Sequence, residues 1–171
     1  MKNLKLPISI DPYKSAQRRL ECNGYFEMSG LERLLAEVDK AESEQINVVV
    51  NFDVDEQGLI VISGSAETQV ALTCQRCNEP FQQELKVKYC YSPVKDEDSA
   101  EQLPSHYDTV VLDENGEVNL RELVEDELII AIPLIPKHNL SECSAKADTS
   151  WGELPDTLEK PNPFDVLKNL K

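Results

Sequence analysis

Hydrophobic and polar residues alternate along three long stretches of the chain, Ile46–Val54, Leu59–Thr73 and Phe81–Tyr91. A period of two is typical of strands that bury one face and leave the other in water. Because Asp55–Gly58 supplies a turn, we expect a hairpin between the first two stretches, which the third extends to a meander of at least three antiparallel strands. Gly64 interrupts the middle strand and predicts a bend or bulge there.

Apolar residues at helical spacing precede the first of these strands. They fall at i, i+3, i+4 and i+7 and comprise Leu31, Leu34, Leu35 and Val38. Such a stripe is typical of a helix that packs one face on a core. Ser29 and Glu32 have the spacing of a capping box, in which each side chain bonds the backbone N–H of the other residue. We therefore expect a packing helix from Ser29 to near Ala41.

A second helical stripe lies in the last third of the chain, from Leu120 to about Ile132. It consists of Leu120, Leu123, Val124, Leu128 and Ala131. Asn119 can cap this helix and Pro133 should end it. The charged outer face carries Arg121, Glu122, Glu125 and Asp126. Glu127 lies inside the apolar stripe, so its carboxylate must find a partner or solvent.

Shorter patterns describe the remaining segments. The alternation over residues 4–10 predicts a short edge strand, and the polar, basic segment Lys14–Glu21 predicts a solvated turn or strand. Asn115 and Gly116 readily form a tight turn, so we expect a small hairpin between Thr109–Leu112 and Glu117–Val118.

Together these elements predict an α+β fold, an antiparallel sheet with a meander of about five strands and two amphipathic helices. We expect a single domain over residues 1–136, with a mobile acidic loop at 92–106, and an extended, largely irregular tail over 137–171. A short helix at 163–170 would present Phe164, Leu167 and Leu170 on one face. That face would dock on its own domain or on another molecule.

Charge is distributed unevenly along the chain, whose net charge is −15. From Asp96 to Glu127 there are twelve Asp or Glu residues and one Arg, whereas the first twenty residues are basic. An acidic protein binds nucleic acid backbones poorly outside a basic patch, so a basic protein partner is the easier inference. The alternative is that the acidity only maintains solubility. No apolar run is long enough for a membrane span, and the first residues lack a secretory signal, so we expect a cytoplasmic protein.

Cys74 and Cys77 form the only Cys-x-x-Cys pair among five cysteines. Two thiolates from one turn can supply half of a tetrahedral zinc site. The candidates for the other half are Cys22, Cys90, His106, His138 and Cys143. Cys90 is disfavoured because it lies roughly 30 Å along the predicted strand, and Cys143 with His138 would have to fold back from the tail. A redox role is less favoured, because that motif belongs at a helix start. The simplest interpretation is two small residues that shape the turn.

Clustered carboxylates at Glu122, Glu125, Asp126 and Glu127 suggest a second chemistry, since such groups can hold magnesium for phosphodiester cleavage. A nuclease site usually draws acids from several elements and adds a base, and the chain has only two histidines. The ordinary explanation is the charged outer face of a helix, and we expect no enzymatic activity.

Several short fragments, in this order along the chain, resemble the YceD family of large ribosomal RNA subunit accumulation proteins. They are Leu6-Pro7, Asp11-Pro12, residues 16–20, Leu72–Cys77, Tyr89–Val94, Val124–Ile129, Trp151–Pro155 and Lys160–Phe164. The resemblance covers nearly the whole chain. It implies a cytoplasmic bacterial protein that is needed for normal synthesis, processing or accumulation of 23S ribosomal RNA, with no established reaction.

Charge and resemblance together suggest an adaptor that binds a basic ribosomal protein or rRNA-processing factor. Arg18 and Arg19 in the N-terminal basic patch, with Arg76 beside the cysteines, are candidates for contact with rRNA. Arg76 could alternatively meet Glu127. The other candidate binding residues are Glu125, Asp126 and Phe164. A metal-dependent RNA-processing enzyme and a small zinc-stabilised binding module remain the alternatives.

Overall fold

The computed structural model describes residues 4–145 of the 171-residue chain. Its main sheet has seven strands. Six of them lie in the order β1 (Leu4–Lys5), β3 (Glu21–Glu27), β5 (Gln45–Val54), β6 (Ile60–Thr73), β7 (Pro80–Val94) and β8 (Asp108–Val111), and β4 (Lys40–Ala41) pairs with β6. A separate ribbon joins β2 (Ser9–Ile10) to β9 (Val118–Asn119). The predicted helix at 163–170, with Phe164, lies outside the described residues.

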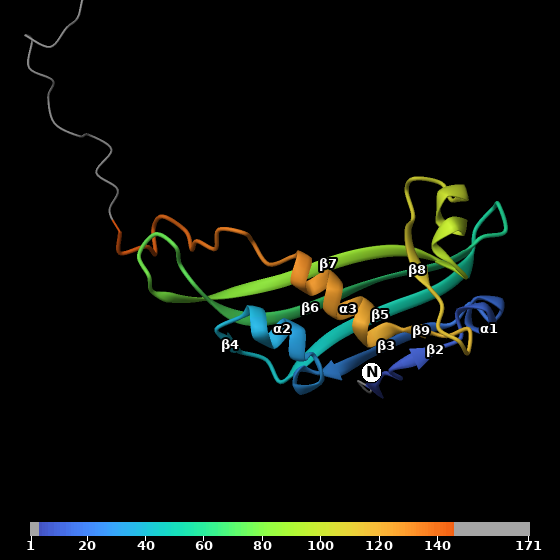
Figure 1. Ribbon diagram of the computed structural model, residues 1–171. Coiled ribbons are helices and arrows are strands. Elements are labelled where there is room, and N and C mark those ends of the chain that lie inside the picture. Colours follow the sequence, from blue (N-terminus) through green and yellow to red (C-terminus); the bar gives the residue numbers. More distant parts are fainter. Residues whose placement is uncertain (1–3, 146–171) are drawn as a thin grey trace, which may run out of the picture.

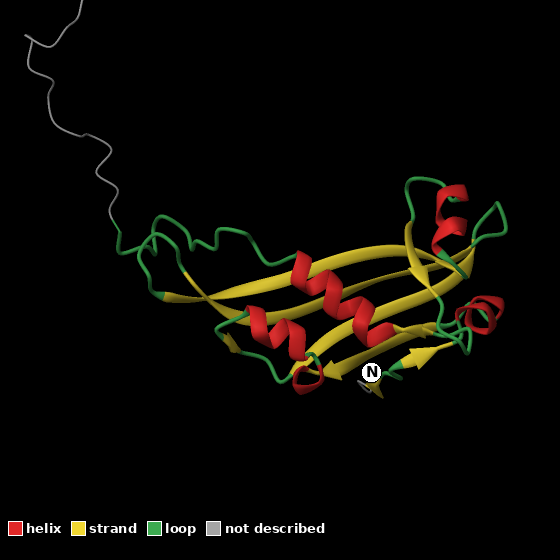
Figure 2. Ribbon diagram, in the orientation of Figure 1, coloured by secondary structure: helices red, strands yellow, loops and turns green. Residues whose placement is uncertain are grey.

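Three α-helices accompany the sheet in the described part of the chain: α1 (Pro12–Gln17), α2 (Glu32–Glu37) and α3 (Leu120–Ile130). Two 3-10 turns, η1 (Met28–Gly30) and η2 (Glu97–Gln102), lie before α2 and within the acidic segment. Figures 1 and 2 show α2 and α3 lying across one face of a long, curved sheet, while α1 lies at one end. None of the described helices has the length and apolarity needed to cross a membrane.

The three long strands confirm the alternation in the sequence. Val48, Val50 and Phe52 of β5 are buried beneath the helices, whereas Asn47 and Asp53 on the other face are exposed. α3 adds a buried stripe that includes Leu123 and Leu128. The fold is therefore α+β, as predicted, and its core lies between one face of the sheet and the helices.

The sheet is larger than predicted and mixed, so a meander of about five antiparallel strands is wrong. β1 runs parallel to β3, and β8 runs parallel to β7. The predicted hairpin around Asn115 and Gly116 does not form, although the tight turn exists and the side chain of Asp113 accepts bonds from the backbone of Asn115 and Glu117. After this turn, β9 pairs with β2 rather than with β8.

The N-terminal segment also differs from the prediction. The segment predicted as a solvated turn or strand, residues 14–21, instead begins within helix α1. Asp11 caps this helix by accepting a bond from the Lys14 N–H at 3.0 Å, and Pro12 lies in its first turn. Asp-Pro is a helix start signal. The sequence pattern also missed β3, in which Asn23, Tyr25 and Glu27 alternate with buried Gly24 and Phe26.

Gly64 does not form a bulge in β6. The register of β6 with β5 and β7 is continuous through this residue, which pairs with Val50 and Tyr89. A Cβ atom here would lie 2.2 Å from the Val49 carbonyl oxygen and 2.6 Å from the Tyr89 hydroxyl. The glycine is therefore required by the Tyr89 side chain, which crosses over it and donates a hydrogen bond to the Val49 carbonyl at 3.2 Å.

The acidic segment also contains more regular structure than expected. β7 continues to Val94, and η2 begins at Glu97, within the segment predicted as a loop. Asp96 caps η2, since its carboxylate accepts a bond from the Ser99 N–H at 2.9 Å. At the other end of the segment, the Tyr107 hydroxyl donates to Asp55 at 3.1 Å, which ties this segment to the β5–β6 turn.

Helix α2 is capped by a residue from α3, not by its own sequence. Ser29 lies in η1 and makes no capping bond, so the predicted capping box is wrong. The carboxylate of Glu125 instead accepts bonds from the backbone N–H groups of Arg33 at 2.8 Å and Leu34 at 3.1 Å. The Arg33 guanidinium adds two bonds to the same carboxylate. Glu125 is thus buried between the helices, and its prediction as an outer-face residue is wrong.

Glu127, which lies within the apolar stripe of α3, has the hydrogen-bond partner that we expected for a carboxylate in that position. It is half-buried, and the Tyr91 hydroxyl of β7 donates a hydrogen bond to its carboxylate. Burial and this nearby carboxylate raise the pKa of Tyr91. The bond links α3 to the sheet, whereas the Glu125 contact links α3 to α2, so the two carboxylates fix the helix against two different elements.

Candidate metal centre

The β6–β7 connection is a tight turn that holds Cys74 and Cys77 close together. The Cys74 N–H donates to the Glu79 carbonyl at 3.0 Å, and the Asn78 N–H donates to the Cys74 carbonyl at 2.8 Å. Asn78 adopts a φ of 59°, a left-handed conformation that asparagine tolerates better than most residues. These bonds close the turn around the two thiols, of which Cys74 is buried and Cys77 half-buried.

The chain beyond α3 lies against this turn. The Gln75 N–H donates to the Pro136 carbonyl at 2.9 Å, and the Arg76 guanidinium donates to the His138 carbonyl at 2.7 Å. The His138 ring packs edge-on against Phe81 at the start of β7, with 5.4 Å between ring centroids. Figure 1 shows this segment passing from the end of α3 to the tip of the β6–β7 hairpin. We call residues 131–145 the return segment.

The return segment brings two further ligand side chains to the cysteine turn. The potential ligand atoms of Cys74, Cys77, His138 and Cys143 all lie within 4.8 Å of one another. Nε2 of His138 lies 3.6 Å from Sγ of Cys77. All four side chains are buried or half-buried, and the three cysteines are not in disulfides. These four residues could hold one metal ion, and we call them the cysteine–histidine cluster.

Hydrogen-bond donors surround the sulfur atoms. Burial raises the pKa of Cys74, but the backbone amides of Arg76, Cys77 and His138 outweigh it and lower the pKa to about 6. For Cys77, burial and the neighbouring thiols raise the pKa. The Arg76 Nε donates to Sγ of Cys143 at 3.0 Å. The site therefore favours negative charge at Cys74 and places a cation beside Cys143.

The outcome for Arg76 differs from the expectation that it meets Glu127. Its guanidinium is committed to the return segment, while Glu127 bonds Tyr91. The other thiols and the second histidine lie elsewhere: Cys22 pairs with Val50 across β3 and β5, Cys90 with Ser63 across β6 and β7. His106 packs against Tyr107, with ring centroids 4.1 Å apart and the rings tilted by 51°.

The acids of α3 do not gather into a second site. Glu125 faces α2, Glu127 faces β7, and Asp126 forms an ion pair with Arg33 at 2.6 Å. Among the side chains that the structure describes, the cysteine–histidine cluster is the only group of three or more acidic, cysteine or histidine side chains with all ligand atoms close together. The helical spacing concealed this arrangement, in which Glu125 and Asp126 both bond Arg33 of α2 while Glu127 bonds Tyr91 of β7.

The N-terminal basic patch is largely paired with local acids. Lys5 bonds Glu27 at 2.9 Å, Lys14 bonds Asp11 at 2.8 Å, and Arg19 lies 3.4 Å from Asp53. Arg18 is exposed at the end of α1 and has no ion pair in the described part of the chain.

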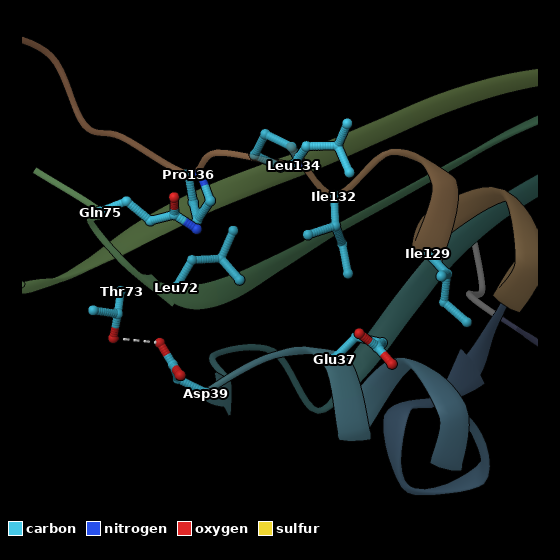
Figure 3. Close-up of a pocket in the computed structure, with 10 residues that line it drawn as sticks. Glu37, Asp39, Leu72, Thr73, Gln75, Ile129, Ile132, Leu134 and Pro136 are labelled. Carbon is cyan, nitrogen blue, oxygen red and sulfur yellow. Dashed lines mark hydrogen bonds between the residues drawn. The ribbon is translucent and has the colours of Figure 1, made fainter.

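A pocket of about 430 Å³ adjoins the cysteine–histidine cluster (Figure 3). Leu72 and Gln75 line it from the hairpin, Ile129 lines it from α3, and Leu134 and Pro136 line it from the return segment. Leu134 is 97% exposed and Ile135 is 57% exposed. One wall of the pocket is therefore formed by the return segment, which also contributes His138 and Cys143 to the cysteine–histidine cluster.

Comparison with known proteins identifies the family. Residues 62–171 match the family model described as large ribosomal RNA subunit accumulation protein YceD. The chain is also 46% identical over 173 aligned positions to the protein of that name from Haemophilus influenzae, covering 100% of this chain and 99% of the relative. No solved structure gives a significant match. The chain therefore belongs to the YceD family of large ribosomal RNA subunit accumulation proteins.

Proposed function

We propose that this protein supports the synthesis, processing or accumulation of 23S rRNA as a non-enzymatic adaptor that binds a basic ribosomal or rRNA-processing protein in the cytoplasm. The name of the family and of its Haemophilus relative supports the role in rRNA accumulation. The observation that carries the adaptor role is an acidic surface with few neutralising cations, because such a surface attracts a basic partner and repels RNA.

This surface is formed by β8, the turn after it and the start of α3. Its exposed acids are Asp108, Asp113, Glu114 and Glu122. Among the described residues, no cation forms an ion pair with Asp108, Glu114 or Glu122. Arg33, which approaches this side of the molecule, is already bonded to Glu125 and Asp126. We call these four exposed acids the acidic surface.

A groove of about 340 Å³ lies beside the acidic surface. Thr109 and Val111 of β8 line one side, and Glu122 and Asp126 of α3 line the other. β8 is an edge strand of the described sheet, so the backbone groups on its outer side can pair with another strand. A lysine- or arginine-rich segment in an extended conformation fits this combination of open edge and carboxylates.

The alternative of a metal-dependent RNA-processing enzyme has weaker support. Glu125 uses both carboxylate oxygens for α2 and Arg33, and Glu127 bonds Tyr91. Two of the acids that would hold magnesium are thus engaged in packing. Incubating purified protein with precursor rRNA and magnesium separates the two functions, since the adaptor account expects no new RNA ends.

Direct contact with rRNA is a secondary part of the proposal. Arg18 and Arg19 are the candidates, because both are exposed at the end of α1. Arg18 has no ion pair among the described residues, whereas Arg19 lies 3.4 Å from Asp53, so Arg18 is the stronger of the two. Arg76 is a weaker candidate than expected, since it bonds the return segment. Any contact through Arg18 and Arg19 would add to the protein-mediated contact rather than replace it.

Affinity purification tests the adaptor role. We expect the tagged protein to recover a basic ribosomal or processing protein both with and without RNase, and we expect recovery to fall as salt rises. Asp108→Lys with Glu122→Lys should weaken binding about tenfold, since two interface ion pairs contribute roughly 0.5–1 kcal/mol each. Quantitative mass spectrometry of the recovered proteins measures this effect.

The matched control is Glu37→Lys with Glu44→Lys, which changes the net charge equally but alters exposed acids of α2 and the β4–β5 connection. It should recover the partner like the unmodified protein. Recovery that RNase abolishes, or equal loss in both double variants, would contradict an adaptor that acts through the acidic surface.

A further inference from the structure

We propose that Cys74, Cys77, His138 and Cys143 bind one zinc ion, which fastens the return segment to the tip of the β6–β7 hairpin. The proposal concerns a structural metal and does not depend on the adaptor function. The turn of the Cys-x-x-Cys motif supplies two of the four ligands, and the return segment after α3 supplies the other two.

The distances in the cluster match the size of a zinc site. Zinc bonds cysteine sulfur at about 2.3 Å and histidine nitrogen at about 2.0–2.1 Å, so tetrahedral ligands lie about 3.5–3.8 Å apart. The separation of Cys77 Sγ and His138 Nε2 is 3.6 Å. The remaining ligand atoms lie within 4.8 Å of one another, so small side-chain movements would complete a tetrahedron.

The chemistry of the four ligands favours zinc over other common ions. Three sulfur atoms and one imidazole nitrogen form a soft set, which magnesium and calcium avoid because they prefer oxygen. Four protein ligands close the coordination sphere, as in structural sites, whereas a catalytic zinc keeps a position for water. The geometry therefore indicates a structural ion.

The surroundings of the sulfur atoms complete the argument. Backbone amides of Arg76, Cys77 and His138 approach the Cys74 sulfur, and the Arg76 guanidinium donates to the Cys143 sulfur at 3.0 Å. Zinc with three thiolates carries one net negative charge, which the guanidinium would balance. Such outer contacts orient ligands and stabilise thiolates at metal sites.

The return segment makes few other contacts that would hold it against the hairpin. Beyond α3, the described residues 131–145 form no helix or strand, and Leu134, Ile135 and Leu140 are mostly exposed. Its contacts with the hairpin include two backbone acceptors and the ring of His138. Ordering this chain costs conformational entropy that these few contacts offset poorly, whereas metal binding couples directly to folding.

Metal analysis of full-length protein, purified without chelator or polyhistidine tag, tests the site. We expect about one equivalent of zinc per chain. Cys143→Ser should retain at least tenfold less zinc, and because Cys143 lies outside the sheet, this variant should still fold. His138→Cys should keep the metal, since a set of four cysteines also forms structural zinc sites. Cys90→Ser, which alters a thiol outside the cluster, should match the unmodified protein.

Limited proteolysis reports the role of the ion. Lys137 is exposed within the return segment, so trypsin should cleave after it several-fold faster once zinc is chelated or Cys143 is replaced. Cleavage elsewhere on the sheet should not change.

Three results would overturn the proposal. One is reduced, folded protein that contains no zinc and takes up none when zinc is added. Another is equal zinc content in Cys143→Ser and the unmodified protein. The third is a metal-free protein whose mass is lower by two hydrogens and whose disulfide maps to the cysteines of the cluster.

Discussion

Replacing Glu125 by alanine should destabilise the fold by about 3 kcal/mol, although the residue belongs to an otherwise charged part of α3. Its carboxylate is the cap of α2 and accepts four hydrogen bonds, two from backbone amides and two from the Arg33 guanidinium. The side chain is 9% exposed. Its removal leaves the buried Leu34 amide without an acceptor, and that loss carries most of the cost. Urea denaturation followed by circular dichroism measures the change.

Asp126→Ala is the matched control for this prediction. Asp126 is the neighbouring acid and also bonds Arg33, but both side chains of this pair are about half exposed. Exposed ion pairs contribute roughly 0–1 kcal/mol, so the control should lose little stability. Glu125→Gln should fall between the two variants, because the amide oxygen can still cap α2. Equal loss for Glu125→Ala and Asp126→Ala would show that the cap contributes nothing.

Gly64→Ala should cost about 3 kcal/mol through crowding in the sheet. The added methyl carbon would meet the Val49 carbonyl oxygen at 2.2 Å and the Tyr89 ring and hydroxyl at 2.6–2.7 Å. The carbonyl belongs to the backbone of β5, so it cannot move without disturbing the β5–β6 pairing. The same denaturation experiment measures the loss.

Two controls separate crowding from other glycine effects. Gly58 has a φ of +85° in the β5–β6 turn, and a methyl group there would meet nothing within 4 Å. Gly58→Ala should therefore cost only about 1 kcal/mol, the strain of its backbone conformation. Tyr89→Phe in the Gly64→Ala background removes the hydroxyl contact but not the contact with Val49, so it should restore little. Full restoration would contradict the account of the carbonyl contact.

The long strands could be predicted because each buries one face along its whole length. Every second residue from Ile46 to Phe52 is apolar and buried, and the prediction for β5 agrees with its observed bounds to within one residue. The cap of α3 could likewise be predicted from a local pattern. The side chain of Asn119 accepts a bond from the Glu122 N–H at 3.1 Å. Local patterns of this kind need no knowledge of distant residues.

Elements that depend on distant partners could not be predicted in the same way. The parallel pairing of β8 with β7 and the ribbon of β2 with β9 join short strands whose own sequences carry no pairing signal. Ser29 has the right spacing for a cap, yet Glu125, 92 residues from Arg33, provides it. Tertiary contacts decide between such competing local options.

Only half of the candidate site could be predicted from a local pattern, for the same reason. The spacing of Cys74 and Cys77 indicates a pair of ligands, whereas His138 and Cys143 lie more than sixty residues away in a stretch without periodicity. The occurrence of a histidine and a cysteine together in one short segment was the available signal. Only the course of the return segment, set by the end of α3, brings them to the hairpin.

We propose that the acidic surface, rather than a catalytic site, supports accumulation of large-subunit rRNA. The ratio of large- to small-subunit rRNA tests this role in cells whose own copy carries Asp108→Lys with Glu122→Lys, at equal protein level. We predict a fall in the ratio toward that of cells lacking the protein, while Glu37→Lys with Glu44→Lys retains the normal ratio. A normal ratio in the first variant would contradict the claim.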